Sequence, residues 1–343
     1  MLTKNKKHRN IPIFIPHLGC PNMCVFCNQR SISGRTRFDR ESVRGEIDAV
    51  LSTIPADCEV EIAFFGGSFT GIDRELMIYL LDVAQSFVDK NDGRARVSGI
   101  RMSTRPDYIS EEILDILSRY SVKAIELGLQ SMDDGVLALS KRGHNAACAE
   151  NACRMIVDKG YELVGQMMIG LPGSTPESEI YTAKKICDMG AQGARIYPTV
   201  VFYDTELACM TTRGEYKMLE LDDAVIRSAG ALDVFEQRGV ECIRIGLCAS
   251  ENLSDDDKVM GGANHPALGE LVLGEYIFGQ MCALINQTNV DTHGKEAAFI
   301  VPRGRLSAAI GQKGVNRERL YSIYGFKSIS IKDGDVHTVS LTL

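Results

Sequence analysis

Three cysteines lie within eight residues near the start of the sequence, at Cys20, Cys24 and Cys27, with the spacing Cys-x3-Cys-x2-Cys. Soft thiolate ligands select zinc or an iron–sulfur cluster. A structural zinc site takes four ligands, but no fourth cysteine or histidine follows at a suitable spacing, and His17 lies on the strand side of the loop. Three thiolates would leave one iron of a [4Fe–4S] cluster open to another molecule. The spacing therefore predicts a cluster held by three protein ligands.

The remaining cysteines are scattered along the chain. The sequence holds 11 cysteines, an odd number, without a recognisable export signal, so a disulfide scaffold is not expected. Several lie at apolar, helix-like positions, where cysteine acts as a small core residue. We expect no metal or redox role for them.

Alternating strand and helix patterns position the cysteine loop, which directly follows the first predicted strand. Strands are predicted at 11–15, 60–65, 97–103, 123–130, 162–169 and 194–201. Helices are predicted at 75–88, 111–119, 134–140, 146–159 and 176–189. Regular alternation of this kind predicts an α/β fold with a parallel sheet and helical crossovers. Catalytic groups in such folds collect at the C-terminal ends of the strands.

Further motifs follow the other predicted strands at the same ends. Gly66 and Gly67 come after the second strand, and paired glycines let a ligand approach the backbone. The sequence Ser-Thr-Arg-Pro-Asp-Tyr at 103–108 follows the third strand. Gln130 ends the fourth strand, and Arg142 follows a short helix. Taken alone, Gln130 and Arg142 could equally be helix caps or surface pairs, although an arginine fork can also bind a carboxylate.

Together, the cysteine loop and these motifs resemble the radical S-adenosylmethionine (SAM) superfamily. The resemblance implies a partial (β/α)6 barrel, a [4Fe–4S] cluster on the three cysteines, and SAM cleavage to a 5′-deoxyadenosyl radical. It implies that Phe26 packs near the adenine. The Gly66–Gly67 pair, followed by Ser68 in place of the family's common acid, would contact the methionine amino group. Gln130 and Arg142 would hold the ribose and the methionine carboxylate.

The blocks from Ile11 to Cys248, most specifically 125–173, are similar to the catalytic subunit of elongator, which modifies the wobble uridine of tRNA. That subunit spaces its first two cysteines more widely and carries an acetyltransferase domain for which this sequence shows no counterpart. The resemblance therefore implies an RNA substrate, tRNA above all, and a reducing partner such as flavodoxin or ferredoxin, and leaves the product open. No catalytic residue is assigned, and Tyr197 and Tyr203 are candidates for radical quenching or binding.

A compact α+β pattern begins at Glu296, after a polar, linker-like stretch at 288–295. It contains a Gly-x-x-Gly loop between two predicted helices, at 306–310 and 316–324. Such a loop lets the backbone lie against phosphate groups. Residues 295–343 carry a net charge of +4, although the whole chain carries −7. Positive charge concentrated in one module fits localised polyanion binding.

This module resembles a KH domain of the type found in bacterial transcription-antitermination factors. The resemblance implies that its RNA contacts come from the loop and the start of the next helix: Gly311, Gln312, Lys313, Gly314 and Arg317. Arg319, in the helix after the loop, could reach the backbone of the same RNA strand. The alternative is a small packing or oligomerisation module with a solvated basic face.

Composition is that of a folded protein of 343 residues, with 45% hydrophobic and 24% charged residues, which excludes disordered and collagen-like classes. No apolar run approaches the roughly 20 residues of a bilayer span, and the basic N-terminus does not continue as a secretory signal. We expect a soluble, cytoplasmic protein without a membrane partner. Its expected parts are a radical SAM core (1–205), a helical elongator-like extension with linker (206–294) and the KH-like module (295–343).

Three functions are compatible with these features. The first is a radical SAM enzyme acting on RNA. The second keeps the radical chemistry but acts on a porphyrin-like or other small molecule, with the module serving only for packing. The third is an RNA-binding protein whose cluster is structural or redox-sensing, for which no SAM cleavage is expected.

Overall fold

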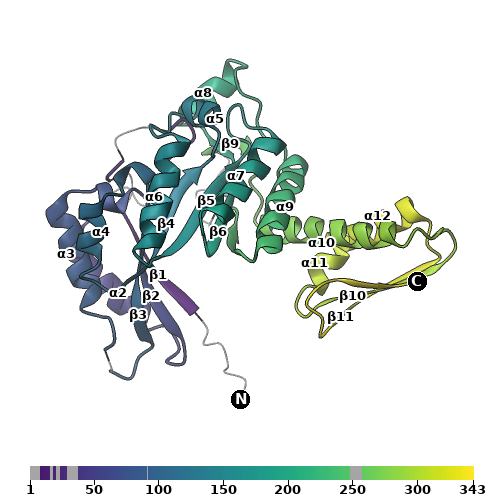
Figure 1. Ribbon diagram of the computed structural model, residues 1–343, viewed down its shortest axis with the longest axis horizontal. Helices are drawn as coiled ribbons and strands as arrows, with labels where there is room; N and C mark the ends of the chain where they lie inside the picture. Colours follow the sequence, from purple (N-terminus) through teal and green to yellow (C-terminus); the bar gives the residue numbers. More distant parts are fainter. Residues whose placement is uncertain (1–7, 16–17, 21–23, 29–37, 91, 248–256) are drawn as a thin grey trace.

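The computed structural model describes residues 8–15, 18–20, 24–28, 38–90, 92–247 and 257–343. Seven strands form one curled sheet, in which every neighbouring pair is parallel (Figure 1). Their order across the sheet is β1 (His8–Phe14), β2 (Glu59–Phe65), β3 (Arg96–Thr104), β4 (Val122–Gln130), β5 (Glu162–Ile169), β6 (Gly193–Pro198) and β8 (Glu241–Ile245). This arrangement confirms the predicted partial barrel.

Helices connect the parallel strands and cover the outer face of the sheet (Figure 1). They are α2 (Val43–Leu51), α3 (Arg74–Gln85), α4 (Glu111–Leu117), α6 (Ala146–Asp158), α7 (Pro176–Asp188) and α9 (Leu221–Arg238). Two shorter helices, α5 (Asp134–Leu139) and α8 (Glu206–Thr212), lie at one end of the sheet (Figure 1). Most begin after a polar residue whose side chain accepts a hydrogen bond from a backbone N–H of the first turn: Asp73, Ser110, Asp133, Asn145, Thr175 and Thr205. These caps fix where each helix starts and hence where the loops after the strands end.

The opposite face of the sheet carries charged side chains. Arg101 on β3 lies between Glu61 on β2, at 2.5 Å, and Glu126 on β4, at 3.0 Å. Arg195 on β6 pairs with the same Glu126 at 2.8 Å. Burial raises the pKa of Glu61, but the hydrogen bonds and charges of His8 and Arg101 lower it more strongly, to about 2. The buried charges therefore compensate one another and tie four strands together.

The sheet has one strand more than the sequence predicts. The additional strand, β8, is an edge strand with mostly exposed side chains, so it lacks a buried pattern. The predicted strand at 194–201 is divided into β6 and β7 (Val200–Phe202), and β7 pairs antiparallel with β9 (Val259–Gly262) outside the main sheet. Helix α2, between β1 and β2, was also missed.

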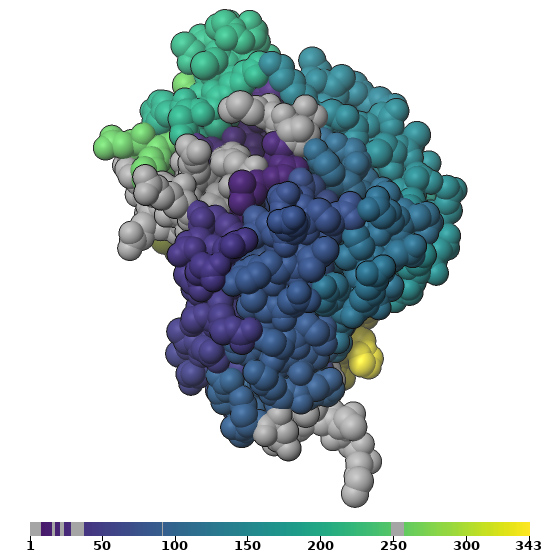
Figure 2. Space-filling view, turned by 90° about the vertical axis from the view of Figure 1, so that its left-hand side faces the viewer, coloured from purple at the N-terminus to yellow at the C-terminus, as the bar shows by residue number. Residues whose placement is uncertain are grey.

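Helix α10 (Leu268–Gln287) joins the barrel to the C-terminal module. The module contains β10 (Glu296–Pro302), α11 (Leu306–Ile310), α12 (Val315–Tyr324), β11 (Ser328–Gly334) and β12 (Ser340–Thr342). Its sheet has the order β11-β10-β12, with β10 parallel to β11 and antiparallel to β12. The module projects from the barrel on the side away from α3 (Figure 1). Figure 2, which faces the N-terminal strands and helices, leaves little of it in view.

Within the described residues, α10 is the one helix long and apolar enough to cross a membrane by length and composition. The sequence shows no uninterrupted apolar run here, because Glu270 and Glu275 lie within the helix. Its buried side chains, among them Val272 and Met281, pack into hydrophobic cores of this fold.

Candidate active site

The cysteine loop is anchored at the C-terminal ends of the strands. The N–H of Val25 donates to the carbonyl oxygen of Ser140 at 3.3 Å, and the carbonyl oxygen of Val25 accepts from the N–H of Leu207 at 2.8 Å. The Cys27 N–H donates to the carbonyl oxygen of Cys24 at 3.0 Å. The loop is thereby held between the end of α5 and the start of α8, the edge where parallel α/β folds place their sites.

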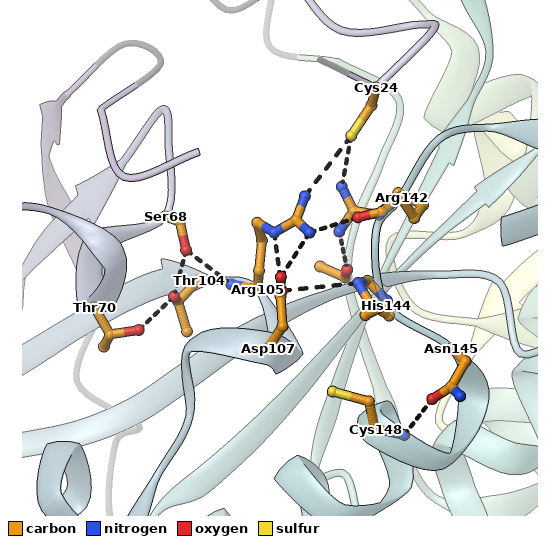
Figure 3. A network of polar contacts seen from close by, with 11 residues as sticks. Cys24, Ser68, Thr70, Thr104, Arg105, Asp107, Arg142, His144, Asn145 and Cys148 are labelled. Carbon is orange, nitrogen blue, oxygen red and sulfur yellow. Dashed lines mark hydrogen bonds and ion pairs between the residues drawn. The ribbon is translucent and has the colours of Figure 1, made fainter. Parts of the chain in front are cut away.

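The sulfur of Cys24 faces two guanidinium groups (Figure 3). Nη1 of Arg142 lies 3.2 Å from Cys24 Sγ, and Nη1 of Arg105 lies 4.0 Å away. Cys24 is buried, whereas Cys20 and Cys27 are half-buried. Burial raises the pKa of Cys20, and the charges of Arg105 and Arg142 act against that rise. Neighbouring cations favour thiolates, which are the metal-binding form of cysteine.

The donors of this loop fit an iron–sulfur cluster by their chemistry. Cys20 and Cys24 carry free thiols, sulfur is the ligand that such clusters take, and the buried Arg105 and Arg142 can compensate negative charge. Across the described ranges, no three His, Cys, Asp or Glu side chains are grouped as a metal site. Residues 21–23 of the loop lie outside those ranges.

An ion pair between the buried Arg105 and the more exposed Asp107 supports this arrangement, although the sequence analysis assigned it no role. Arg105 donates from Nε and Nη2 to the two carboxylate oxygens of Asp107, at 2.9 and 2.8 Å. It also donates to the carbonyl oxygen of Arg142. Burial raises the pKa of Asp107, but Arg105 outweighs it and holds the pKa below its ordinary value. The signal was the strand-end motif at 103–108, whose Arg-x-Asp spacing allows a bidentate pair.

Gly66 and Gly67 pack against the backbone of the cysteine loop. Gly66 has φ of 95°, and a Cβ on Gly67 would lie 2.4 Å from the carbonyl oxygen of Leu18. The N–H of Ser68 donates to that oxygen at 3.1 Å. Glycine is needed here because two backbone segments meet. The contact of this pair with SAM stays a prediction.

A chain of hydroxyl groups continues from Ser68 (Figure 3). The N–H of Arg105 donates to Ser68 Oγ at 3.2 Å, and Ser68 Oγ lies 2.9 Å from Thr104 Oγ1. Thr104 Oγ1 lies 2.6 Å from Thr70 Oγ1, which donates to the carbonyl oxygen of Tyr108 at 2.8 Å. An amide N–H can only donate and a carbonyl oxygen can only accept. The protons therefore all point from Ser68 through Thr104 to Thr70.

Gln130 and Arg142 keep buried atoms that have no hydrogen-bond partner among the described residues. These are Oε1 of Gln130 and Nε of Arg142. Gln130 has φ of 67° where the pairing of β4 with β5 shifts register. Arg142 uses its Nη2 on the carbonyl oxygen of Gly128. Unpaired buried polar atoms are costly, so an acceptor and a donor are available here for a polar ligand.

His144 lies beside this network and is neutral. Its side chain is fully buried, with Nδ1 3.9 Å from Asp107 Oδ1 (Figure 3). Burial lowers its pKa to about 4, the charge of Arg142 adds to the effect, and Asp107 opposes it. The imidazole therefore adds no positive charge to the two guanidinium groups.

The predicted aromatic residues differ in their surroundings. Phe26 is half-buried and packs against an apolar cluster that includes Val201 and Leu207. Tyr197 is half-buried and its hydroxyl interacts with Arg195. Tyr203 is 55% exposed. Of the two tyrosines, Tyr197 lies on β6, a strand of the main sheet, and Tyr203 does not.

The predicted RNA-binding loop forms a tight turn between α11 and α12. Gly311, Lys313 and Gly314 have φ of 78°, 54° and 80°, values that favour glycine. Gln312, Lys313 and Arg317 are exposed. The Arg319 guanidinium, by contrast, is bound to Glu275 of α10, and its contact with RNA stays a prediction.

Unpaired cations gather at this loop. Of the module's Lys and Arg side chains, three form ion pairs: Arg303, Arg319 and Lys327. Three have no ion pair in the described part of the chain: Lys313 in the loop, Arg317 in the first turn of α12, and Arg305 at the start of α11. The other two, Lys295 and Lys332, lie on other segments. Positive charge is therefore left free mainly beside the Gly-x-x-Gly turn.

Comparison with known proteins identifies the family. The radical SAM superfamily matches residues 14–186, and the radical SAM C-terminal domain matches residues 191–276. The chain belongs to the radical SAM superfamily. The predicted cofactors, a [4Fe–4S] cluster and SAM, are confirmed by this membership.

Relatives of this chain include elongator complex protein 3 and tRNA uridine(34) acetyltransferases, which confirms the predicted resemblance. Elongator complex protein 3 of Saccharomyces cerevisiae is 28% identical over 59% of this chain and 43% of its own length. A tRNA uridine(34) acetyltransferase of Methanocaldococcus infernus is 25% identical over 60% of this chain and 46% of its own. The chain thus spans less than half of either relative.

Among solved structures, the M. infernus Elp3 with an N-terminal deletion superposes with a TM-score of 0.63 at 21% identity. The match covers 81% of this chain and 64% of that one. At this identity the likeness establishes the fold.

Proposed function

We propose that this protein is a radical SAM enzyme that modifies RNA, with tRNA as the leading substrate. The observation that carries the proposal is the joining, in one chain, of an elongator-like barrel and a Gly-x-x-Gly loop flanked by unpaired cations. The name of the M. infernus relative, a tRNA uridine(34) acetyltransferase, supports the substrate class.

Cys20, Cys24 and Cys27 would hold the cluster, with Arg105 and Arg142 compensating its charge. When bound, the cluster and SAM supply a 5′-deoxyadenosyl radical that abstracts hydrogen from the substrate or adds to it. The protein's own side chains orient the reactants and exclude water. The buried ionic network around Arg101 and Glu126 serves this role by keeping the strands below the site fixed.

The strand-end motifs would bind SAM. Oε1 of Gln130 accepts a hydrogen bond from a ribose hydroxyl, and the guanidinium of Arg142 binds the methionine carboxylate. The Gly66–Gly67 pair and Ser68 lie by the methionine amino group, where backbone atoms supply the contact because the Ser68 hydroxyl is already bonded to Thr104. Phe26 would pack near the adenine.

The C-terminal module would hold the RNA backbone. Lys313 and Arg317 supply charge, while Gly311, Gln312 and Gly314 let the backbone approach phosphates. Binding of this kind depends steeply on salt, since each neutralised phosphate releases counterions.

One-electron reduction requires a donor, and a flavodoxin- or ferredoxin-like protein fits that role. The cytoplasm is the proposed compartment. The ten cysteines in the described ranges are not joined in disulfides, which suits a reducing environment.

The experiment that tests this proposal is anaerobic. The protein is reconstituted with iron and sulfide, given SAM and dithionite, and assayed for 5′-deoxyadenosine with and without bulk tRNA. We expect tRNA-stimulated formation in the wild type and none in Cys24→Ala, with Cys153→Ala, a core cysteine, as the control. Formation indifferent to tRNA would instead favour a small-molecule substrate. No formation by a fully loaded protein would favour a binding or sensing role.

A further inference from the structure

Helix α10 belongs to two hydrophobic cores at once. Leu268 and Val272 lie in the barrel core, whereas Phe278 and Met281 lie in the core of the C-terminal module. Leu273, between them, packs against both. Packed cores resist continuous deformation, so one unbroken helix with both sets of contacts fixes the module relative to the barrel.

The Gly311–Gly314 loop lies at the barrel end of this helix. Asn316, just after the loop, donates from Nδ2 to the carbonyl oxygen of Gly274 at 3.0 Å. Gly269 marks where α10 meets the end of β8, since a Cβ there would lie 3.6 Å from the carbonyl oxygen of Ile245. At about 1.5 Å per residue, these two positions of α10 are about 7 Å apart along the helix. The loop is therefore close to the edge strand of the barrel.

Helix α12 runs from the loop away from the barrel. Tyr324, at its other end, places its hydroxyl 3.1 Å from Oδ1 of Asn286, near the C-terminus of α10. The N-terminus of α12 has no side-chain cap and points back toward the barrel. The exposed cations Lys313 and Arg317 lie at that end.

Arg319 fixes α12 on α10. Its Nη1 and Nη2 lie 2.5 and 3.2 Å from the carboxylate oxygens of Glu275, and its guanidinium lies 3.6 Å from the centre of the Phe278 ring. A salt bridge combined with a cation–π contact holds a side chain in one orientation. Ser307 makes a similar link for α11 by donating to Glu270 at 2.8 Å.

We propose that α10 is a rigid mount that presents RNA bound at the Gly311–Gly314 loop in a constant position relative to the barrel mouth. This inference rests on the proposed function. The partner is a single-stranded RNA segment next to the target nucleotide, because a loop of this kind clamps about four nucleotides of single strand. Arg319 is a positioning residue, since its guanidinium is held by Glu275 and the Phe278 ring and it acts through α12.

The test compares Arg319→Met with Arg303→Met in the full-length, cluster-loaded protein. Arg303 forms an exposed ion pair with Asp335 in the same module and serves as the matched control. We expect Arg319→Met to keep RNA affinity and RNA-independent SAM cleavage within about twofold, while RNA stimulation of cleavage falls about fivefold or more. Arg303→Met should leave all three unchanged. If RNA stimulated SAM cleavage by Arg319→Met as strongly as by the wild type, with folding confirmed by thermal unfolding, the proposal that α10 is a rigid mount would be overturned.

A crosslink provides a second, independent readout. A photo-crosslinking amino acid in place of the exposed Gln312 should react at one nucleotide position, at a constant offset from the modified nucleotide, in the wild-type background. In Arg319→Met the crosslinks should spread over several positions. Crosslinks spread over several positions in the wild type would overturn the proposal of a rigid mount. They would leave the proposal of RNA modification intact. A wild type that neither binds RNA nor responds to it would overturn the proposed function itself.

Discussion

Arg142 donates from Nη1 to the Cys24 sulfur at 3.2 Å and from Nη2 to the carbonyl oxygen of Gly128. One guanidinium therefore connects the cysteine loop to the end of β4. Its Nε remains unpaired among the described residues. With the proposed roles of Cys24 as a cluster ligand and of Arg142 at the SAM carboxylate, this position would allow Arg142 to act on both cofactors.

Replacing Arg142 with Gln should weaken SAM binding about tenfold, because a charge-assisted hydrogen bond is lost. The midpoint potential of the cluster should also become more negative, since removing a nearby positive charge disfavours the added electron. Equilibrium dialysis and an EPR-monitored redox titration measure the two effects. Arg154→Gln, an exposed arginine on α6, is the control. An unchanged midpoint potential in Arg142→Gln would mean that Arg142 does not influence the cluster.

Glu61 gives the fold a defined sensitivity to acid. Its ordinary pKa of 4.5 falls to about 2 in the folded protein. Between these values the unfolded state binds more protons, so the stabilisation is fully present above about pH 4.5 and is lost as the pH falls toward 2. A shift of this size corresponds to about 3 kcal/mol.

The substitution Glu61→Gln should therefore destabilise the cluster-free protein at neutral pH, and its difference from wild type should shrink below about pH 4. Urea unfolding at several pH values measures this. Glu112→Gln removes an exposed ion pair with Arg74 and should change the free energy of unfolding by less than about 1 kcal/mol. A pH-independent difference for Glu61→Gln would contradict the assignment.

The hydroxyl chain predicts a contrast at Thr104. Thr104→Val removes the acceptor of Ser68 and the donor to Thr70, which should cost about 1–3 kcal/mol of unfolding free energy. Thr104→Ser keeps both hydrogen bonds and should cost about half as much or less. Denaturant unfolding of the cluster-free protein distinguishes them. Equal losses would mean that the methyl group contributes as much as the hydroxyl at this position, which would contradict the predicted contrast.

The loop cations predict a change in salt dependence. Lys313→Ala and Arg317→Ala should each lower the slope of log affinity against log salt by about 1 if each side chain neutralises a phosphate. Lys332→Ala, which removes a cation from β11, should leave the slope unchanged. SAM cleavage without RNA should be normal in all three. Fluorescence anisotropy with labelled tRNA over a salt series makes the measurement, and equal slopes would place the RNA elsewhere.

Local patterns predicted the barrel and the position of its site because strand alternation and strand-end motifs are short-range features. Cys24, Gln130 and Arg142 all follow predicted strands or the helix next to one, and the fold brings their loops to one edge. The sequence could not predict which side chains from distant segments contact one another. The contact of Arg142 with Cys24 joins residues far apart in the chain.

The same limit explains which features of the structure the sequence did not predict. Arg319 belongs to a basic stretch after the loop, and only the packing of α12 on α10 shows that Glu275 neutralises it. Strand β8 was missed because an edge strand with exposed side chains has little apolar pattern. Arg105 and Asp107 were visible as a motif, but their role depends on contacts that only the tertiary structure forms, such as that of the buried Arg105 with the carbonyl oxygen of Arg142.

The most direct test of RNA modification is the mass of the RNA nucleosides after the reaction. Unmodified tRNA is incubated anaerobically with the cluster-loaded protein, SAM and reductant, then digested and analysed by mass spectrometry beside the Cys24→Ala variant. The account predicts one nucleoside with an altered mass, present only with wild-type protein, SAM and reductant together. Formation of 5′-deoxyadenosine with no change in any nucleoside would contradict it.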